Sequence, residues 1–174
     1  RITDAGESEG RPYLVCERLH GCTLAELMEQ LGEPPVDIAH LWAALQDRTP
    51  GALGADAATK PWSGLARPRS TWAIVAADLV RAAAEGVAHA HERGVLHRDL
   101  KPSNLFLERN GRVVVIDFGL AFTAGGERLT TTNVPVGTPA YAPPELLRDG
   151  RRPPDARGDV WSLGVCLYEL VAFR

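Results

Sequence analysis

Cysteine is scarce in this sequence, which contains only Cys16, Cys22 and Cys166. Three scattered cysteines form neither a disulfide framework nor a paired set of metal ligands, so a reducing compartment fits best. A basic excess is also missing, because 19 Lys and Arg stand against 22 Asp and Glu and give a net charge of -3. Proteins that bind a phosphate backbone or an anionic membrane carry such an excess. We therefore expect no nucleic acid as a partner.

Long hydrophobic runs are absent as well. The longest, residues 160–168, is interrupted by Glu169 and falls well short of the ~20 residues that a membrane-spanning helix needs. We expect no membrane contact from this segment and a cytoplasmic location, with a parent protein anchored elsewhere left open. The 174 residues, 45% of them hydrophobic, match one globular domain. Because the first residue is Arg1 and not Met, we expect a piece of a longer protein.

Apolar spacing predicts the main helices and one early strand. Residues 13–16 predict a strand that runs into an extended connection. Thr23 predicts the N-cap of a helix over residues 24–31, since Glu26 completes a capping box and Gly32 follows the last turn. Three further helices are predicted over residues 36–47, 71–94 and 159–173. The last of them is apolar on almost every side, so we expect it to be buried all round.

The remaining segments predict a hairpin and two long loops. Asn110-Gly111 predicts a tight turn between strands over residues 105–108 and 113–117. Residues 48–70 are rich in Pro, Gly and Ala without periodicity, which indicates a surface insertion. Residues 123–144 also lack periodicity and predict an exposed loop. Loops of that length within a compact domain are usually functional.

The segment between the long helix and the hairpin concentrates side chains that carry chemistry. Residues 97–104 read HRDLKPSN, a density of polar and charged groups that core packing does not produce. The second hairpin strand ends in Asp117, so the turn can bring its carboxylate beside the amide of Asn104. Mg²⁺ takes carboxylate and amide oxygens as ligands and keeps waters and substrate phosphates in its other positions. The sequence therefore predicts a site for a phosphate-bound Mg²⁺.

At this point the chain resembles the protein kinase family, in its serine/threonine branch. The resemblance rests on an ordered set of motifs: HRD with its Lys and Asn in residues 97–104, DFG in 117–119, GTPAYAPPE in 137–145 and DVWSLG in 159–164. Any one of these could occur by chance, but the ordered set is specific. The resemblance spans residues 13–173, with residues 48–70 outside it.

The resemblance implies an α+β, protein-kinase-like fold that is mainly the helical C-lobe, with a hinge strand and a catalytic-loop β-hairpin. It assigns residues 13–20 to the last N-lobe strand and the hinge. It assigns residues 21–174 to the first part of the C-lobe, with the insertion at about 48–70. The N-lobe is otherwise expected to be absent, because no glycine-rich loop and no lysine and glutamate pair precede residue 13.

The resemblance also implies a role for each polar residue of the motifs. Asp99 would orient the acceptor hydroxyl and take its proton, and Lys101 would steady the transferred phosphate, as in serine/threonine kinases. Asn104 and Asp117 would hold Mg²⁺. Thr138 would hydrogen-bond near Asp99 and shape the peptide pocket.

For the nucleotide, the resemblance implies contacts made largely by main chain. Glu17 and Leu19 would offer backbone groups to the adenine, and Phe106 would lie under the ring. Cys16 would lie at the entrance to the back pocket, although an inert filler is an equally open interpretation. The cofactors implied are therefore ATP and Mg²⁺.

Three more positions carry regulatory or structural expectations. Arg98 would bind a phosphate carried by the activation loop. The candidate phosphate acceptors are Thr130, Thr131 and Thr132, which in the alternative interpretation are only polar loop residues. His97 is expected to pack against Phe118 rather than to act as a base. Asp159 either caps the last helix or accepts backbone N–H groups of the catalytic loop.

The function implied is transfer of the ATP γ-phosphate to Ser or Thr hydroxyls of a protein substrate. The 174 residues alone are expected to be inactive, since half of the nucleotide cleft is missing. A pseudokinase-like binding or scaffold module stays open as the alternative. A small-molecule phosphotransferase is disfavoured, because such relatives usually lack the Arg98 type of position and the segment 117–145.

Overall fold

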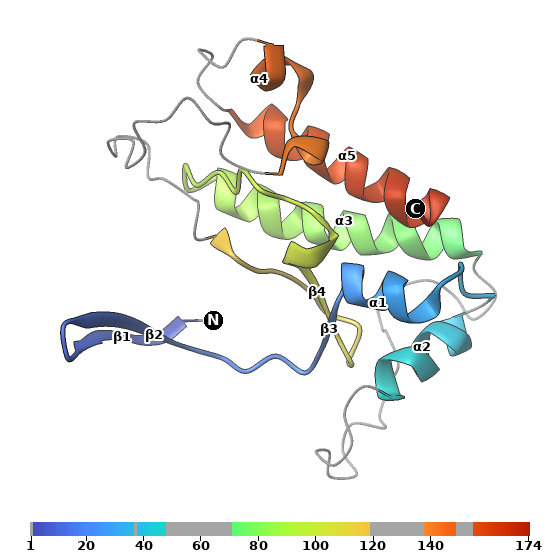
Figure 1. Ribbon diagram of the computed structural model, residues 1–174, viewed down its shortest axis with the longest axis horizontal. Coiled ribbons are helices and arrows are strands. Elements are labelled where there is room, and N and C mark those ends of the chain that lie inside the picture. The colour runs from blue at the N-terminus through green and yellow to red at the C-terminus, as the bar shows by residue number, and fades with distance from the viewer. Residues whose placement is uncertain (1, 37, 48–70, 119–137, 149–154) are drawn as a thin grey trace.

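The computed structural model describes residues 2–36, 38–47, 71–118, 138–148 and 155–174, which form helices and two small antiparallel sheets (Figure 1). The described helices are α1 Leu24–Leu31, α2 Ile38–Asp47, α3 Trp72–His91, α4 Pro144–Arg148 and α5 Ala156–Ala172. One sheet contains β1 Ile2–Ser8 and β2 Arg11–Cys16, and the other contains β3 Gly21–Thr23, β4 Leu105–Glu108 and β5 Val113–Val115. Two short 3-10 helices are η2 Pro102–Asn104 and η4 Pro139–Tyr141. The predicted α+β class is confirmed.

Two sequence predictions concern segments that the structure covers only in part. The predicted insertion, residues 48–70, lies outside the described residues, as does most of the predicted loop over 123–144. Within the described ranges, no helix combines the length and the apolar character that crossing a membrane requires.

The predicted start of α1 is confirmed atom by atom. Thr23 Oγ1 accepts a hydrogen bond from Glu26 N at 3.2 Å, and Glu26 Oε2 accepts one from Thr23 N at 2.8 Å. This is the reciprocal capping box that the sequence predicts. Gly32 ends the helix in the left-handed region with φ of 68°, a conformation that glycine adopts without steric cost.

The core lies where α3 packs against α5 and against the sheet of β3, β4 and β5 (Figure 1). α3 buries a stripe of apolar side chains spaced by four residues: Val75, Leu79, Ala83 and Val87. α5 contributes Leu163, Cys166 and Leu170. At one end Trp72 Nε1 donates a hydrogen bond to Leu170 O at 2.5 Å. Burial of each large side chain stabilises the fold by roughly 1.5–3 kcal/mol. The packing of α3 against α5 therefore holds the end of α3, from which the segment 97–104 continues.

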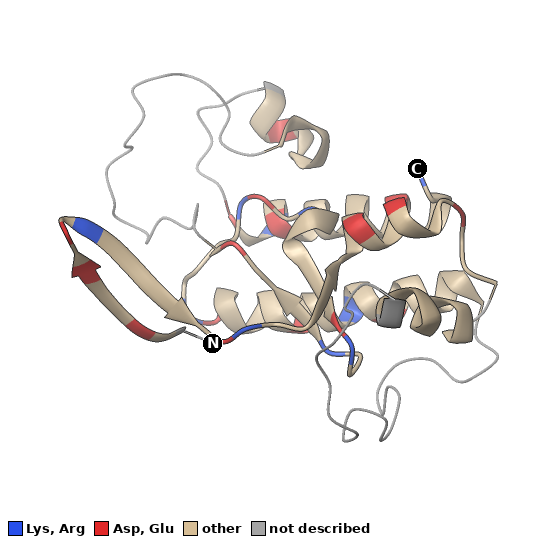
Figure 2. Cartoon of the chain, turned by 60° about the horizontal axis from the view of Figure 1, so that its bottom comes forward, with Lys and Arg blue, Asp and Glu red and all other residues tan. Residues whose placement is uncertain are grey.

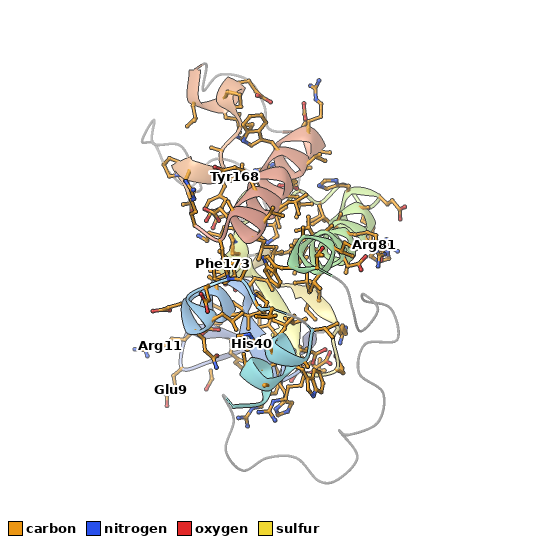
Figure 3. The ribbon with its side chains drawn as sticks, turned by 90° about the vertical axis from the view of Figure 1, so that its right-hand side faces the viewer. Glu9, Arg11, His40, Arg81, Tyr168 and Phe173 are labelled. Carbon is orange, nitrogen blue, oxygen red and sulfur yellow. The ribbon has the colours of Figure 1, made fainter. Side chains whose placement is uncertain are left out.

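The prediction that the last helix is buried all round is wrong. α5 buries one side against α3 and η4, but the other side is exposed at Val160, Trp161, Tyr168 and Val171. Tyr168, labelled in Figure 3, is 65% exposed. The helix also begins earlier than predicted, because Asp155 is its N-cap and accepts a hydrogen bond from Arg157 N at 2.9 Å. In the described part of the structure, α5 is therefore exposed on one side although its sequence is apolar on almost every side.

The strand predicted over residues 13–16 belongs to a longer hairpin. β2 begins at Arg11 and pairs antiparallel with β1, a strand that the sequence analysis did not predict. Glu9 and Gly10 form the turn, both with positive φ, 52° and 73°. β1 has little apolar alternation, and its turn lacks the Asn-Gly signal, so periodicity could not find it. Figure 1 shows this hairpin as an arm that residues 17–20 join to the rest.

The predicted hairpin at Asn110-Gly111 is confirmed, with β4 and β5 paired so that Leu105 lies opposite Val115. β3 adds a third strand to this sheet, which the sequence analysis did not predict. Gly21 of β3 lies very close to the neighbouring strand. A Cβ built at Gly21 would lie 2.0 Å from Leu107 O and 2.9 Å from Glu108 Cα.

Replacing Gly21 by alanine is therefore expected to push β3 away from β4. Backbone atoms cannot move aside as a flexible side chain can, so we expect a loss of about 1–3 kcal/mol in the free energy of unfolding. Urea denaturation of the full-length protein measures this. Gly164→Ala in α5 is the matched control, because its added Cβ meets nothing within 4 Å and alanine favours a helix by roughly 0.5–1 kcal/mol. Equal stability of the two variants would contradict the close approach.

Candidate active site

Asp159 of α5 binds the backbone that leads into Asp99. Its side chain is 2% exposed, and it accepts hydrogen bonds from His97 N to Oδ2 at 2.9 Å and from Arg98 N to Oδ1 at 2.8 Å. Arg98 has φ of 68°, a left-handed conformation that costs of order 1–3 kcal/mol outside glycine and persists only where other bonds impose it. Of the two interpretations left open for Asp159, the structure shows the bond to this backbone and not the helix cap.

His91 supplies a third donor to the same carboxylate. Its Nε2 lies 2.7 Å from Asp159 Oδ2. The deprotonated carboxylate only accepts hydrogen bonds, so this nitrogen carries the hydrogen. Sequence reasoning missed the contact, because 68 positions separate the two residues and a histidine in the last helical turn has no local signal for its partner.

His97 links the segment 97–104 to the end of the hairpin. It is fully buried, and its Nε2 lies 2.9 Å from Ile116 O, which can only accept, so Nε2 carries the hydrogen. Its Nδ1 accepts a bond from Asp99 N at 3.3 Å. The ring packs against Phe118 with 4.7 Å between the centroids. The predicted packing of His97 on Phe118 is confirmed.

The carboxylate of Asp99 lies at the centre of a hydrogen-bond network. Oδ1 accepts from Thr138 N at 3.0 Å and from Thr138 Oγ1 at 3.1 Å. Oδ2 lies 2.8 Å from Lys101 Nζ and 3.4 Å from Asn104 Nδ2. Lys101 Nζ also donates to Thr138 Oγ1 at 2.9 Å. The structure thus brings together four of the predicted site residues, and it places Thr138 beside Asp99 as expected.

This network sets the charge of Asp99. Partial burial raises the pKa of the carboxyl group, but hydrogen bonds from Lys101 and Thr138 outweigh burial and hold the pKa below its usual 3.8. The carboxylate therefore stabilises the fold above the ordinary carboxyl pKa, and this stabilisation is lost as pH falls through the lowered value.

Replacing Lys101 by methionine is expected to raise the pKa of Asp99, since the charge-assisted hydrogen bond disappears while the apolar stem remains. A carboxyl NMR titration of the full-length protein measures the shift directly. Lys60→Met serves as the charge-matched control, because it removes the same charge outside the motifs. An unchanged Asp99 titration in Lys101→Met would contradict the described network.

Asn104 and Asp117 lie on adjoining backbone. Ile116 N donates to Asn104 O at 3.0 Å, which fixes the residue before Asp117 against Asn104, the last residue of η2 and the one directly before β4. Asn104 Nδ2 donates to Asp99 O at 2.7 Å, so its amide oxygen is the atom suited to a cation. Asp117 is exposed and has φ of 60°. Carboxylate and amide oxygens suit Mg²⁺, so the residues fit this ion.

The cation would not be held by protein side chains alone. No cluster of three or more His, Cys, Asp or Glu that could hold a metal occurs among the residues the structure describes. Mg²⁺ sites that hold a nucleotide typically use one or two protein carboxylates together with substrate phosphates.

Beyond Asp99, η4 is fastened to α5. Tyr141 Oη donates to Glu169 Oε2 at 2.8 Å, and Ser162 Oγ donates to Tyr141 O at 2.9 Å. Burial, and then the bond to Glu169, raises the pKa of Tyr141. Because Thr138 directly precedes η4, these bonds place it against Asp99. Asp159, Ser162 and Glu169 of one helix thus hold both sides of the site.

The residues predicted to contact the adenine lie apart from this network. Glu17 and Leu19 belong to the connection 17–20, exposed and half-buried respectively, and Cys16 is exposed at the end of β2. Phe106 is half-buried on β4, two residues after Asn104, between Thr23 of β3 and Val114 of β5 in the sheet.

The regulatory predictions are only partly within the described structure. Arg98 is half-buried, and its Nε is buried without a hydrogen-bond partner among the described residues. The predicted phosphate acceptors Thr130, Thr131 and Thr132 lie outside the described residues.

Comparison with known proteins places these motifs in a family. A family profile described as Protein kinase domain matches residues 65–174. The serine/threonine-protein kinase PknL of Mycobacterium tuberculosis is 33% identical over 170 residues, which is 98% of this chain and 33% of that protein. A probable serine/threonine-protein kinase, pknA2 of Bifidobacterium longum, is 30% identical over 171 residues, 98% of this chain and 17% of that protein.

A eukaryotic relative matches the chain over a shorter range. The serine/threonine-protein kinase Nek3 of Mus musculus is 45% identical over 89 residues, 51% of this chain and 17% of that protein. The chain spans a third or less of each of these relatives. Together with the geometry around Asp99, these matches show that the chain belongs to the protein kinase family, in its bacterial-type serine/threonine branch.

Proposed function

We propose that this chain forms the transfer site of a protein kinase that moves the γ-phosphate of ATP to Ser or Thr hydroxyls of a protein substrate. The observation that carries the proposal is the Asp99 carboxylate, ionised and fixed by Lys101, Asn104 and Thr138. A carboxylate with a lowered pKa and fixed orientation suits a group that must align a hydroxyl and receive its proton.

Each residue of the network has a chemical task in this proposal. Asp99 orients the acceptor hydroxyl and accepts its proton as the oxygen attacks the phosphorus. Lys101 carries positive charge beside that point, where the transferred phosphoryl group gathers negative charge. Asn104 and Asp117 would hold Mg²⁺, which supplies neutralisation of the phosphate charge when bound. Thr138 fixes the positions of Asp99 and Lys101 relative to each other, because its hydroxyl is hydrogen-bonded to both side chains.

The binding contacts follow the same assignment. Backbone groups of Glu17 and Leu19 receive the adenine, and Phe106 contacts the ring. Arg98 binds the phosphate carried by a phosphorylated Thr130, Thr131 or Thr132 and so orders the loop. Residues 13–20 form the last N-lobe strand and hinge, and residues 21–174 the first part of the C-lobe.

Surface charge fits a protein substrate and not a nucleic acid. Figure 2 colours the ribbon blue at Lys and Arg and red at Asp and Glu, and both colours occur along the described part of the chain; the net charge is -3. The composition, with 19 Lys and Arg against 22 Asp and Glu, supplies no basic excess for a phosphate backbone. The proposed reaction consumes ATP, which places the site on the cytoplasmic side of any membrane.

The test uses the full-length protein and its binding of ATP with and without Mg²⁺. Calorimetry is expected to show ATP binding that Mg²⁺ strengthens in the unchanged protein. Asp117→Ala should remove the Mg²⁺ effect while leaving metal-free ATP binding in place. If Mg²⁺ strengthens ATP binding equally in both proteins, Asp117 does not hold the ion, and if neither binds ATP, the proposed function is wrong.

A further inference from the structure

We propose that Arg112 is a positioning residue for nucleotide binding, which it serves by fixing the connection 17–20 against the turn of the β4–β5 hairpin. The inference rests on the proposed function, because Glu17 and Leu19 of this connection are the residues proposed to receive the adenine. It adds a residue that no motif of the sequence marks. Three features of the molecule bear on this role: a hydrogen-bonded turn, a connection attached to that turn by its backbone, and an ion pair between the two.

The turn that carries Arg112 is rigid. Gly111 N donates to Glu108 O at 2.9 Å, and Arg112 N donates to Asn110 Oδ1 at 2.8 Å. Glu108 N in turn donates to Arg112 O at 2.9 Å. Gly111 has φ of 86°, in the left-handed region where glycine is at ease. The backbone of Arg112 is therefore fixed by main-chain and side-chain bonds before its own side chain is considered.

The same turn already touches the connection through its backbone. Arg109 N donates to His20 O at 2.9 Å, and directly after His20 the chain enters β3, where Gly21 lies opposite Glu108. This end of the connection is thus fixed to the hairpin. The other end leads into β2, which belongs to a separate sheet, as Figure 1 shows. A second point of attachment on the connection would fix the angle at which it leaves the hairpin.

Arg112 provides that point. Its Nη1 lies 3.4 Å from Glu17 Oε1 and 3.4 Å from Glu108 Oε2. Glu108 is the fixed partner, since its side chain is only 11% exposed, against 40% for Glu17. The guanidinium therefore joins a carboxylate held in the sheet to a carboxylate on the connection, across 95 positions of sequence.

The expected effect is on nucleotide binding and not on transfer. Fixing the connection beforehand orients the backbone groups of Glu17 and Leu19 before the nucleotide arrives, which lowers the ordering cost of binding. Arg112 makes no described contact with Asp99 or Lys101, so the rate at saturating ATP should not depend on it. Coupling across ion pairs with this exposure corresponds to about a two- to fivefold change in affinity.

The experiment measures ATP affinity by calorimetry, and kcat and KM for ATP, on the full-length protein at low salt. Arg112→Met keeps the apolar stem and removes the charge, and Glu17→Gln keeps the backbone proposed to contact the adenine. Each is expected to weaken ATP binding about two- to fivefold, and Arg112→Met should leave kcat unchanged. The double variant should be no weaker than either single one, and Arg112→Lys should restore part of the affinity. Raising the salt should reduce the difference.

Arg81→Met is the matched control, since the Arg81 side chain is 52% exposed and pairs with Glu85 on the surface of α3, against 53% exposure for Arg112. It should leave ATP affinity unchanged. The positioning role of Arg112 is overturned if Arg112→Met binds ATP as tightly as the protein without substitutions, or if the losses of the two single variants add in the double variant. The proposed function still stands in that case, provided that the protein without substitutions is active. An unchanged protein that binds no ATP overturns both.

Discussion

Replacing Asp99 by asparagine is expected to lower the rate of phosphotransfer about 1,000-fold, within the range that a positioned general base contributes. Asparagine has nearly the same shape, so its oxygen can still accept a bond from Thr138. Its amide nitrogen, however, donates where carboxylate Oδ2 accepted, and it meets donors on Lys101 and Asn104. The variant therefore loses both the proton acceptor and the negative charge that holds Lys101.

The rate is measured on the full-length protein with labelled ATP and a protein acceptor, at saturating concentrations of both. Asp155→Asn is the matched control, because asparagine caps a helix about as well as aspartate and Asp155 is exposed at the start of α5. It should keep nearly the full rate. A rate for Asp99→Asn within tenfold of the unchanged protein would remove Asp99 from the chemical step.

Replacing Asp159 by alanine is expected to lower the free energy of unfolding by about 3–5 kcal/mol, as removal of one partner from a buried charged network does. Three donors lose their acceptor at once: His97 N, Arg98 N and His91 Nε2. Unpaired buried donors are costly, and the left-handed Arg98 loses the bond that holds it. Phosphotransfer should fall too, because Asp99 follows directly.

Urea denaturation of the full-length protein measures the loss. Asp155→Ala on the same helix is the control, and as an exposed N-cap it should cost only about 0.5–2 kcal/mol. If Asp159→Ala does not fold, the free energy of unfolding is measured on Asp159→Asn instead. Asparagine has the size of aspartate but only one oxygen that can accept hydrogen bonds. Equal costs at Asp155 and Asp159 would contradict the central place of Asp159 in the site.

The local elements of this fold could be predicted from the sequence, because their determinants lie within a few residues. The capping box of Thr23 and Glu26 and the turn at Asn110-Gly111 are examples. The packing of His97 on Phe118 followed from the family resemblance and is likewise found. In each case the residues that decide the structure are those that the pattern names.

Contacts between distant segments could not be predicted in the same way. The bond of His91 to Asp159 and the pair of Arg112 with Glu17 join residues 68 and 95 positions apart. The uncovered side of α5 is similar, because hydropathy shows that a helix is apolar and not which neighbours cover it. The strand β1 could not be predicted because its own composition does not favour a strand. Its pairing with β2 makes it one.

We propose that Asp99 and its neighbours catalyse transfer of phosphate to protein hydroxyls. The most direct measurement incubates the full-length protein with γ-labelled ATP, Mg²⁺ and a protein acceptor, and then identifies the labelled amino acids. We predict label on serine or threonine from the unchanged protein and about 1,000-fold less from Asp99→Asn. Equal label from both proteins, or no label on any protein hydroxyl, would contradict the account.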